Sequence, residues 1–70
     1  MQAIQRRLGA KVRALRKARG WSQDLLGDRS GLHRAHVGEI ERGEANVTIQ
    51  TLKILADTLD VTMSELVRSL

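Results

Sequence analysis

Apolar residues recur at intervals of three and four along most of this chain, and no segment alternates apolar and polar residues with a period of two. Intervals of three and four place side chains on one face of an α-helix, whereas a half-buried strand requires alternation. The pattern therefore predicts an all-α fold, a compact domain of five helices over residues 4–19, 22–29, 34–42, 48–60 and 63–70. With 70 residues and no linker-like segment, we expect a single domain spanning residues 1–70.

Residues that favour helix ends flank these ranges. Gly20 and Gly43 follow the first and third helices, at positions where a left-handed backbone is common. Ser22 is a good N-cap for the second helix, and the spacing Thr62-x-x-Glu65 forms a capping box for the fifth. The side chains predicted to face the core are Ile4, Leu8, Val12 and Leu15 in the first helix, Val37 and Ile40 in the third, and Ile49, Leu52, Leu55, Ala56 and Leu59 in the fourth.

The composition excludes several kinds of site. The chain has no cysteine, so it forms no disulfide or thiolate zinc site, and its two histidines are too few for a structural metal centre. It contains no glycine-rich phosphate loop, so we expect no metal, no cofactor, no small-molecule ligand and no enzymatic activity. No apolar run approaches the roughly 20 residues that span a bilayer, which predicts a cytoplasmic protein without a membrane partner.

Positive charge is concentrated in the first helix. The chain carries 12 Lys and Arg against 8 Asp and Glu, for a net charge of +4. Residues 1–20 contain no acid, and their bases are Arg6, Arg7, Lys11, Arg13, Arg16, Lys17 and Arg19. Such a segment favours a polyanionic partner such as a nucleic acid, although an acid-free amphipathic helix also permits weak binding to anionic membranes.

The second and third helices, joined by the tight connection Ser30-Gly31-Leu32, meet the requirements of a helix-turn-helix over residues 22–42. The chain resembles the DNA-binding domain of the lambda repressor and Cro (XRE-type) family in R-K-A-R-G-W-S-Q at 16–23, S-G-L at 30–32, V-x-x-I-E-R-G at 37–43 and L-x-x-L-A at 52–56. Within that family, R-A-H-V-G-E-I-E-R-G at 34–43, followed by N-V-T-I at 46–49, is most similar to the small controller proteins of restriction-modification systems.

The outer face of the third helix is the predicted reading surface for DNA bases, through Arg34, Ala35, Gly38 and Glu39. Arg34 lies in the first turn, where a guanidinium that binds guanine O6 and N7 supplies roughly 1–3 kcal/mol of discrimination. Ala35 is placed to contact a thymine methyl group and Glu39 to accept from cytosine N4, with passive surface roles as the alternative. Gly38 indicates either a close approach of the backbone to the duplex or plain tolerance of glycine in a short helix.

The residues predicted to contact DNA phosphates lie around this face and are Ser22, Gln23, His36, Arg42 and Asn46. Free N–H groups at the start of the second helix, together with the Gln23 amide, suit a phosphate, and the family resemblance implies that this glutamine anchors the DNA backbone. Arg42 and Asn46 lie at the end of the third helix and in the following loop. A turn-forming role for Asn46 and an ordinary surface position for His36 are the alternatives.

The resemblance also implies a structural ion pair between Arg16 and Glu41, which ties the first helix to the third.

Two further features concern packing. Trp21, the only aromatic residue, is expected to pack between the first two helices. The fifth helix carries more apolar surface than one packing contact requires, which predicts a two-fold homodimer interface formed by Met63, Leu66, Val67 and Leu70.

Two residues depart from the family pattern. Leu25 stands in the second helix where the family usually has a polar residue, which predicts an exposed leucine that is able to meet a partner. His33 precedes the third helix, where Ser, Thr or Asp is usual, and histidine is a poor N-cap.

These features predict a nucleoid-associated, sequence-specific regulator of transcription that binds an inverted-repeat operator in double-stranded DNA as a homodimer. The two third helices are expected in successive major grooves about 34 Å apart. A site that overlaps a promoter gives repression, whereas a site just upstream brings the protein next to RNA polymerase and gives activation, and similarity to controllers implies regulation of its own promoter. The alternative is an antitoxin or coactivator-type adaptor that binds a protein partner through the same fold.

Overall fold

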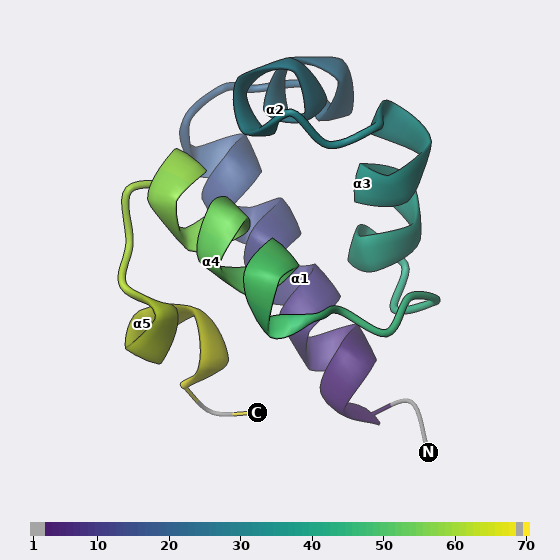
Figure 1. Cartoon of the computed structure of the whole chain (residues 1–70), viewed down its shortest axis with the longest axis vertical. Coiled ribbons are helices and arrows are strands. Elements are labelled where there is room, and N and C mark those ends of the chain that lie inside the picture. Colours follow the sequence, from purple (N-terminus) through teal and green to yellow (C-terminus); the bar gives the residue numbers. More distant parts are fainter. Residues whose placement is uncertain (1–2, 69) are drawn as a thin grey trace.

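The computed structural model describes residues 3–68 and 70, and these residues form five α-helices in chain order. The helices are α1 (Ala3–Ala18), α2 (Gln23–Ser30), α3 (Arg34–Glu41), α4 (Ile49–Thr58) and α5 (Met63–Val67). Helix α1 is the longest and packs against both α3 and α5, while α4 packs against α2 and α5 (Figure 1). No strand occurs among the described residues, so the predicted all-α fold of five helices is confirmed.

Hydroxyl side chains cap the starts of three helices. The side chains of Ser22, Thr48 and Thr62 each accept a hydrogen bond from the backbone N–H three residues later, at 3.0, 3.1 and 2.9 Å. Glu65 completes the predicted capping box at the start of α5 by accepting from the backbone N–H of Thr62. Each such cap satisfies an N–H group that the first turn of a helix leaves without a partner.

The start of α3 is capped more weakly, as expected. His33 precedes the helix in extended conformation, and its Nδ1 accepts from the N–H of Ala35 at 3.4 Å, which is long for a hydrogen bond. The helix nevertheless begins at Arg34, the predicted position, because packing of its inner face against the core supplements this cap.

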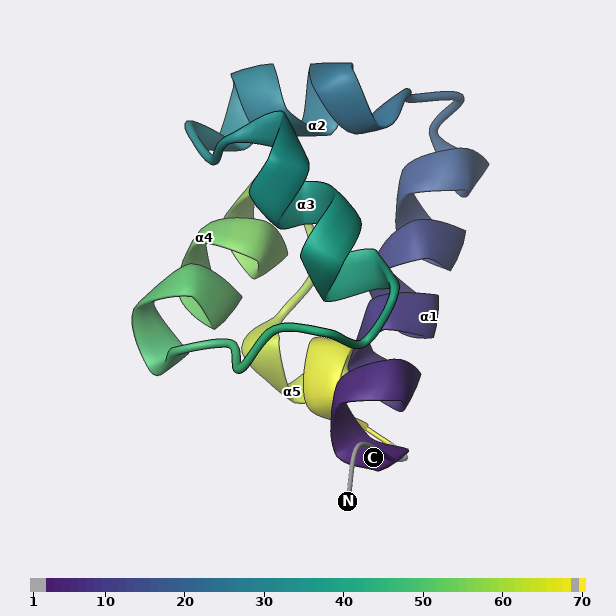
Figure 2. The same cartoon turned by 90° about the vertical axis from the view of Figure 1, so that its right-hand side faces the viewer.

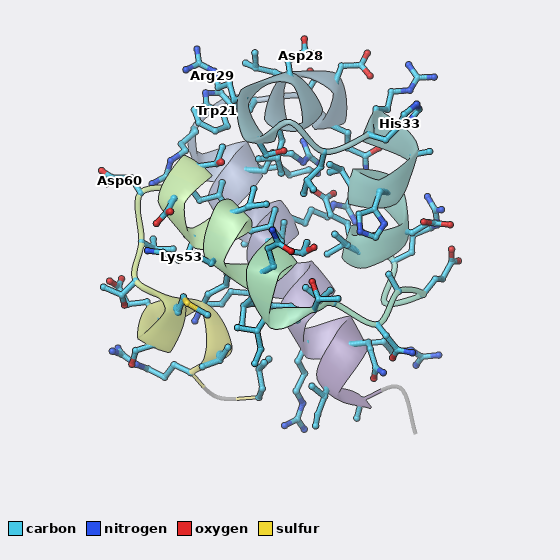
Figure 3. All side chains as sticks on the ribbon, viewed as in Figure 1. Trp21, Asp28, Arg29, His33, Lys53 and Asp60 are labelled. Atoms are coloured by element: carbon cyan, nitrogen blue, oxygen red, sulfur yellow. The ribbon has the colours of Figure 1, made fainter. Side chains whose placement is uncertain are left out.

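The hydrophobic core receives side chains from all five helices. Its fully or nearly fully buried members are Leu8, Val12, Leu26, Val37, Ile40, Leu55, Ala56, Leu59 and Leu66. Trp21 lies at the edge of this core, half-buried, with the Arg29 guanidinium 4.8 Å from the centre of its ring. Figure 3 shows Trp21 beside Arg29, on the opposite side of the molecule from His33.

Two residues predicted to face the core are exposed instead. Ile4 is 61% exposed and Ile49 is 78% exposed. Each stands in the first turn of its helix, where no neighbouring element covers it. A periodic pattern predicts the direction in which a side chain points, but not whether another helix extends far enough to cover it.

The last helix is shorter than predicted. It ends at Val67, because Arg68 adopts an extended backbone with φ −62° and ψ 136°, so the expectation of a helix through residue 70 is wrong. Ser69 lies outside the described residues. The described part of α5 makes little more than one turn, and its shape is therefore determined mainly by packing.

Candidate nucleic-acid interface

Helices α2 and α3 form the predicted helix-turn-helix. The backbone of Gly31 ends α2 at φ 76°, and the next helix begins three residues later. A Cβ atom on Gly27 would lie 3.0 Å from the carbonyl oxygen of Leu32, so glycine at this position lets the turn pass close to α2. In Figure 2, α3 lies at the front of the molecule with α2 across its N-terminal end and α1 beside it.

A buried ion pair joins α1 to the end of α3. The Arg16 guanidinium donates from Nε to Glu41 Oε2 at 2.6 Å and from Nη2 to Oε1 at 2.9 Å, and the two side chains are only 9% and 2% exposed. Its third nitrogen, Nη1, donates to the carbonyl oxygen of Trp21 at 2.6 Å. Gln23 Nε2 also donates to Glu41 Oε1, at 3.1 Å. The predicted ion pair is confirmed, and Gln23 extends it into a buried cluster of Arg16, Glu41 and Gln23.

The electrostatics of the buried cluster favour its charged form. Desolvation by burial would raise the pKa of Glu41, but hydrogen bonds from Arg16 and Gln23 and the charges of Arg16 and Arg13 together lower that pKa below its ordinary value of 4.5. The hydrogen bond to Glu41 likewise raises the pKa of Arg16, despite the opposing effect of burial. Both groups are therefore ionised at neutral pH, and they connect α1, α2 and α3 at one point.

Glycine allows α1 to approach the C-terminal end of α3 unusually closely. A Cβ atom on Gly9 would lie 2.6 Å from the carbonyl oxygen of Glu41, and one on Gly43 would lie 2.8 Å from Cγ of Arg6. This packing role of Gly9 was not predicted from the sequence. The signal that was available is a glycine inside a helix, which costs about 1 kcal/mol relative to alanine and therefore calls for a packing reason.

The outer face of α3 carries three of the predicted base-contacting residues in exposed positions: Arg34, Ala35 and Glu39. Arg34 Nη1 lies 3.1 Å from Oδ1 of Asp24 on α2, and these side chains are 71% and 60% exposed. Glu39 Oε1 lies 3.4 Å from Nδ1 of half-buried His36. The pairing of Asp24 with Arg34 was not predicted from the sequence, although the two residues lie in the first turns of the two helices of the motif.

Gly38 occupies a different environment from the one predicted. It is buried, and a Cβ atom there would lie 3.0 Å from Nη1 of Arg42 and 3.6 Å from Oε1 of Gln23. The guanidinium of Arg42 therefore lies over Gly38, while its Nε donates to Glu44 at 3.1 Å. In the free protein the missing side chain of Gly38 thus makes room for Arg42, and a close approach of the Gly38 backbone to a duplex would require Arg42 to move.

The predicted phosphate contacts lie at both ends of the α3 face. Ser22 caps α2 through its hydroxyl, and Gln23 is half-buried in the cluster described above. At the other end, Asn46 is exposed and its Oδ1 accepts from Nε2 of Gln5 at 2.9 Å. The structure thus brings these residues to the two margins of α3, but Gln23 and Asn46 each use one polar group internally.

Three of the four predicted dimer residues pack, fully or partly, against the core of their own chain. Leu66 is fully buried in the core, so the prediction that it contacts a second copy is wrong. Met63 and Leu70 are partly buried against the same core, and Val67 is 40% exposed. Helix α5 packs against both α1 and α4, which accounts for much of the apolar surface that the sequence pattern assigned to a dimer. Leu25, predicted to be exposed, is half-buried.

The helices formed by the described residues are all too short or too polar to span a lipid bilayer. Within the same residues there is no group of three or more potential metal ligands, and no pocket. The features of this surface are thus charged and polar side chains on helices rather than a cavity.

Comparison with known proteins places this arrangement in a family. A model of the helix-turn-helix family HTH_3 matches residues 12–66. The control protein C.SmaI of Serratia marcescens is 44% identical over 59 residues, which cover 84% of this chain and 70% of that protein. Three further curated relatives are longer, and this chain spans between 36% and 42% of their length.

Solved structures agree with this assignment. The restriction-modification controller protein C.AhdI of Aeromonas hydrophila superposes with a TM-score of 0.86 at 42% identity, over 89% of this chain and 94% of that one. The controller protein C.Esp1396I, solved as a tetramer with its natural 35 base-pair operator, superposes with a TM-score of 0.84 at 25% identity, over 91% and 84% of the two chains. The predicted lambda repressor-like fold and family resemblance are confirmed, and the family comprises regulators rather than enzymes. The chain belongs to the helix-turn-helix (XRE) family of DNA-binding transcriptional regulators, which includes the restriction-modification controller proteins.

Proposed function

We propose that this protein binds an inverted-repeat operator as a homodimer and controls transcription from the adjoining promoter, including its own. The observation that carries the proposal is the contrast between the two sides of α3. Its inner side is fixed by the buried cluster, while Arg34, Ala35 and Glu39 stand exposed on the outer side. A rigid helix with a polar outer face is the arrangement required to read bases in a major groove.

Reading of a base by Arg34 requires an exchange of partners. In the free protein Nη1 of its guanidinium lies against Asp24, and in the complex the guanidinium would instead donate to guanine O6 and N7. Arg42, held over Gly38, would reach the same groove or its margin from the other end of α3. Ser22, Gln23, His36 and Asn46 would supply hydrogen bonds to phosphates, which set the position of the helix along the duplex.

Dimerisation would use the small apolar surface that α5 leaves exposed. Val67 is its centre, with the accessible parts of Met63 and Leu70 beside it. The similar controller C.Esp1396I, solved as a tetramer on its operator, supports the binding of more than one copy to a duplex. A dimer bound over a promoter would block RNA polymerase, and a dimer bound just upstream would be placed to contact it.

Fluorescence anisotropy tests the proposal, with purified protein titrated onto duplex DNA from immediately upstream of its gene and onto a shuffled duplex, at about 50 and 200 mM salt. We expect at least a 10³-fold preference for the native duplex, in the range of specific regulators. Equal and strongly salt-dependent binding to both duplexes would contradict operator recognition in that region.

The adaptor function receives less support. It depends on exposed apolar surface at α5 and Leu25, and the structure buries Leu66 fully and Leu25 partly. Recovery of a stoichiometric protein partner, together with equal binding to the two duplexes, would favour that function over the proposal.

A further inference from the structure

Most of the positive charge in α1 lies outside the buried cluster. Of the seven bases in residues 1–20, only Arg16 belongs to the buried cluster. Arg19 lies near the Trp21 ring, with its guanidinium carbon 5.9 Å from the centroid. The remaining five bases are exposed or partly exposed, so the charge they carry is available to a partner.

These five bases divide between two sides of α1. At 100° per residue, Arg6, Arg13 and Lys17 fall within about 40° of one another, and we call them the α1 stripe. Arg7 and Lys11 lie on another side of the helix. Arg7 Nη1 donates to the carbonyl oxygen of Leu70 at 3.2 Å, which shows that this second side faces the C-terminal end of the chain.

The α1 stripe adjoins the C-terminal end of α3. Arg6 packs directly on Gly43, the residue that follows α3, since a Cβ atom on Gly43 would lie 2.8 Å from Cγ and 2.9 Å from Cα of Arg6. Arg13 lies near enough to Glu41 for its charge to act on that carboxylate. Lys17 is one turn beyond Arg13, toward the start of α2, and α1 runs beside α3 in Figure 2.

The charges of the α1 stripe are not neutralised locally. Within residues 3–68 and 70, no salt bridge joins Arg6, Arg13 or Lys17 to an acid. The neighbouring carboxylates of Glu41 and Glu44 are already paired, with Arg16 and Arg42 respectively. The stripe therefore extends the margin of α3 as a row of unpaired cations.

We propose that the α1 stripe is a second phosphate-binding surface, which holds the backbone of the same duplex beside the groove that α3 reads. This inference rests on the proposed function for the position of the duplex. Its occupant is DNA because the stripe is continuous with the α3 margin and opposite in charge to phosphates. Contacts to phosphates carry no sequence information, so the stripe would strengthen binding to operator and shuffled duplex alike.

Two double variants that remove the same charge from α1 test the proposal. Arg13→Gln with Lys17→Gln removes two charges from the stripe, whereas Arg7→Gln with Lys11→Gln removes two charges from the other side. Anisotropy titrations at several salt concentrations give the slope of log Kobs against log salt for each protein, on the native and the shuffled duplex. Circular dichroism establishes that both variants are folded, and sedimentation reports their oligomeric state.

The stripe variant should lower the magnitude of the salt slope by about 0.9 for each phosphate that the protein no longer neutralises, hence by about 1.8 per bound protomer, on both duplexes. The matched variant, Arg7→Gln with Lys11→Gln, should leave the salt slope nearly unchanged. Arg13→Lys should also leave it unchanged, because it keeps the positive charge. Equal decreases for the two doubles, or no decrease for the stripe variant, would overturn the proposal. The shuffled duplex contains no operator and therefore reports phosphate binding alone. If the wild type fails to prefer the native duplex, that result contradicts the proposed function, while the salt slopes on the shuffled duplex still test the stripe.

Discussion

Two ion pairs connect α3 to the rest of the protein, one on each side of the helix. On the inner side, Arg16 and Glu41 are 9% and 2% exposed and form two hydrogen bonds with each other. On the outer side, Arg34 and Asp24 are 71% and 60% exposed, and a single nitrogen of the guanidinium approaches the carboxylate. The same chemical groups thus occur in two very different dielectric environments.

The difference in burial assigns different tasks to the two pairs. Separating a buried pair is costly because each charge would be left without a counter-ion and without water to solvate it. A buried pair can therefore fix the position of a helix. An exposed pair contributes at most about 1 kcal/mol and is readily exchanged for another partner. The inner pair is therefore suited to hold α3, and the outer pair to release Arg34 to a base.

The largest effect is expected from Glu41→Gln, which leaves Arg16 charged and buried. Loss of one partner of a buried pair costs about 3–5 kcal/mol, and for a domain of this size about 3 kcal/mol lowers Tm by roughly 12 °C or more. Thermal unfolding followed by circular dichroism measures this change. Glu39→Gln, on the exposed face of the same helix, should stay within about 0.5 kcal/mol. Equal values of Tm for the two variants would show that the buried Glu41 contributes no more to stability than the exposed Glu39.

Gly9→Ala tests whether the inner pair requires the close approach of α1 and α3. Helix propensity alone predicts a gain of about 1 kcal/mol in stability. The structure predicts a loss of about 1–3 kcal/mol, because the new Cβ atom would lie 2.6 Å from the carbonyl oxygen of Glu41 and the helices would have to separate. Urea denaturation measures the sign of the change in unfolding free energy. A variant more stable than the wild type would show that α1 and α3 are not tightly packed at Gly9.

The pH dependence of the unfolding free energy should report the ionisation of Glu41 in the buried inner pair. The pKa of Glu41 is lowered in the folded protein, so its contribution is present above the ordinary value of 4.5 and is lost as the pH falls through the folded-state pKa. The difference in unfolding free energy between the wild type and Glu41→Gln should therefore shrink from about pH 7 toward about pH 3. Denaturation curves at several pH values measure it, and a constant difference would be inconsistent with an ionised Glu41.

A small effect on stability is expected from Asp24→Asn, which breaks the outer pair. Loss of an exposed pair should change the free energy of unfolding by about 0.2–1 kcal/mol, while release of Arg34 and removal of a negative charge near DNA should strengthen DNA binding by up to about fivefold. The matched control is Asp57→Asn, which breaks the similarly exposed Lys53–Asp57 pair on α4. If both variants bind DNA alike, Asp24 does not compete for Arg34.

The sequence predicted those features that depend on local patterns. Periodicity and caps identified the helices, and the family resemblance identified the Arg16–Glu41 pair. The prediction that Leu66 forms a dimer interface failed, because an apolar stripe does not reveal whether its own chain or a second copy covers it. The prediction that Ile49 faces the core failed for the converse reason: its side chain is 78% exposed, although Leu52 on the same helix packs against the core.

Interactions between distant residues were the least accessible from the sequence. The role of Gly9 depends on the carbonyl oxygen of Glu41, far along the chain, and the hydrogen bond from Gln23 to Glu41 spans 18 positions. Nothing in the local pattern around Gly38 distinguishes an open backbone from one covered by Arg42. Such interactions arise from the angles between helices, which binary patterns of apolar and polar residues leave undetermined.

The most direct test of the account is the effect of Arg34→Ala on sequence preference, measured by anisotropy on the native upstream duplex and on its shuffled counterpart. Loss of one guanidinium that reads a guanine should weaken binding to the native duplex by about 1–3 kcal/mol, roughly 5- to 150-fold, and weaken binding to the shuffled duplex far less. Loss of the exposed pair with Asp24 should lower the free energy of unfolding by no more than about 1 kcal/mol, so the variant is expected to remain folded. A uniform loss of affinity for both duplexes would contradict the account, because Arg34 would then contact only phosphates and the outer face of α3 would not be the reading surface.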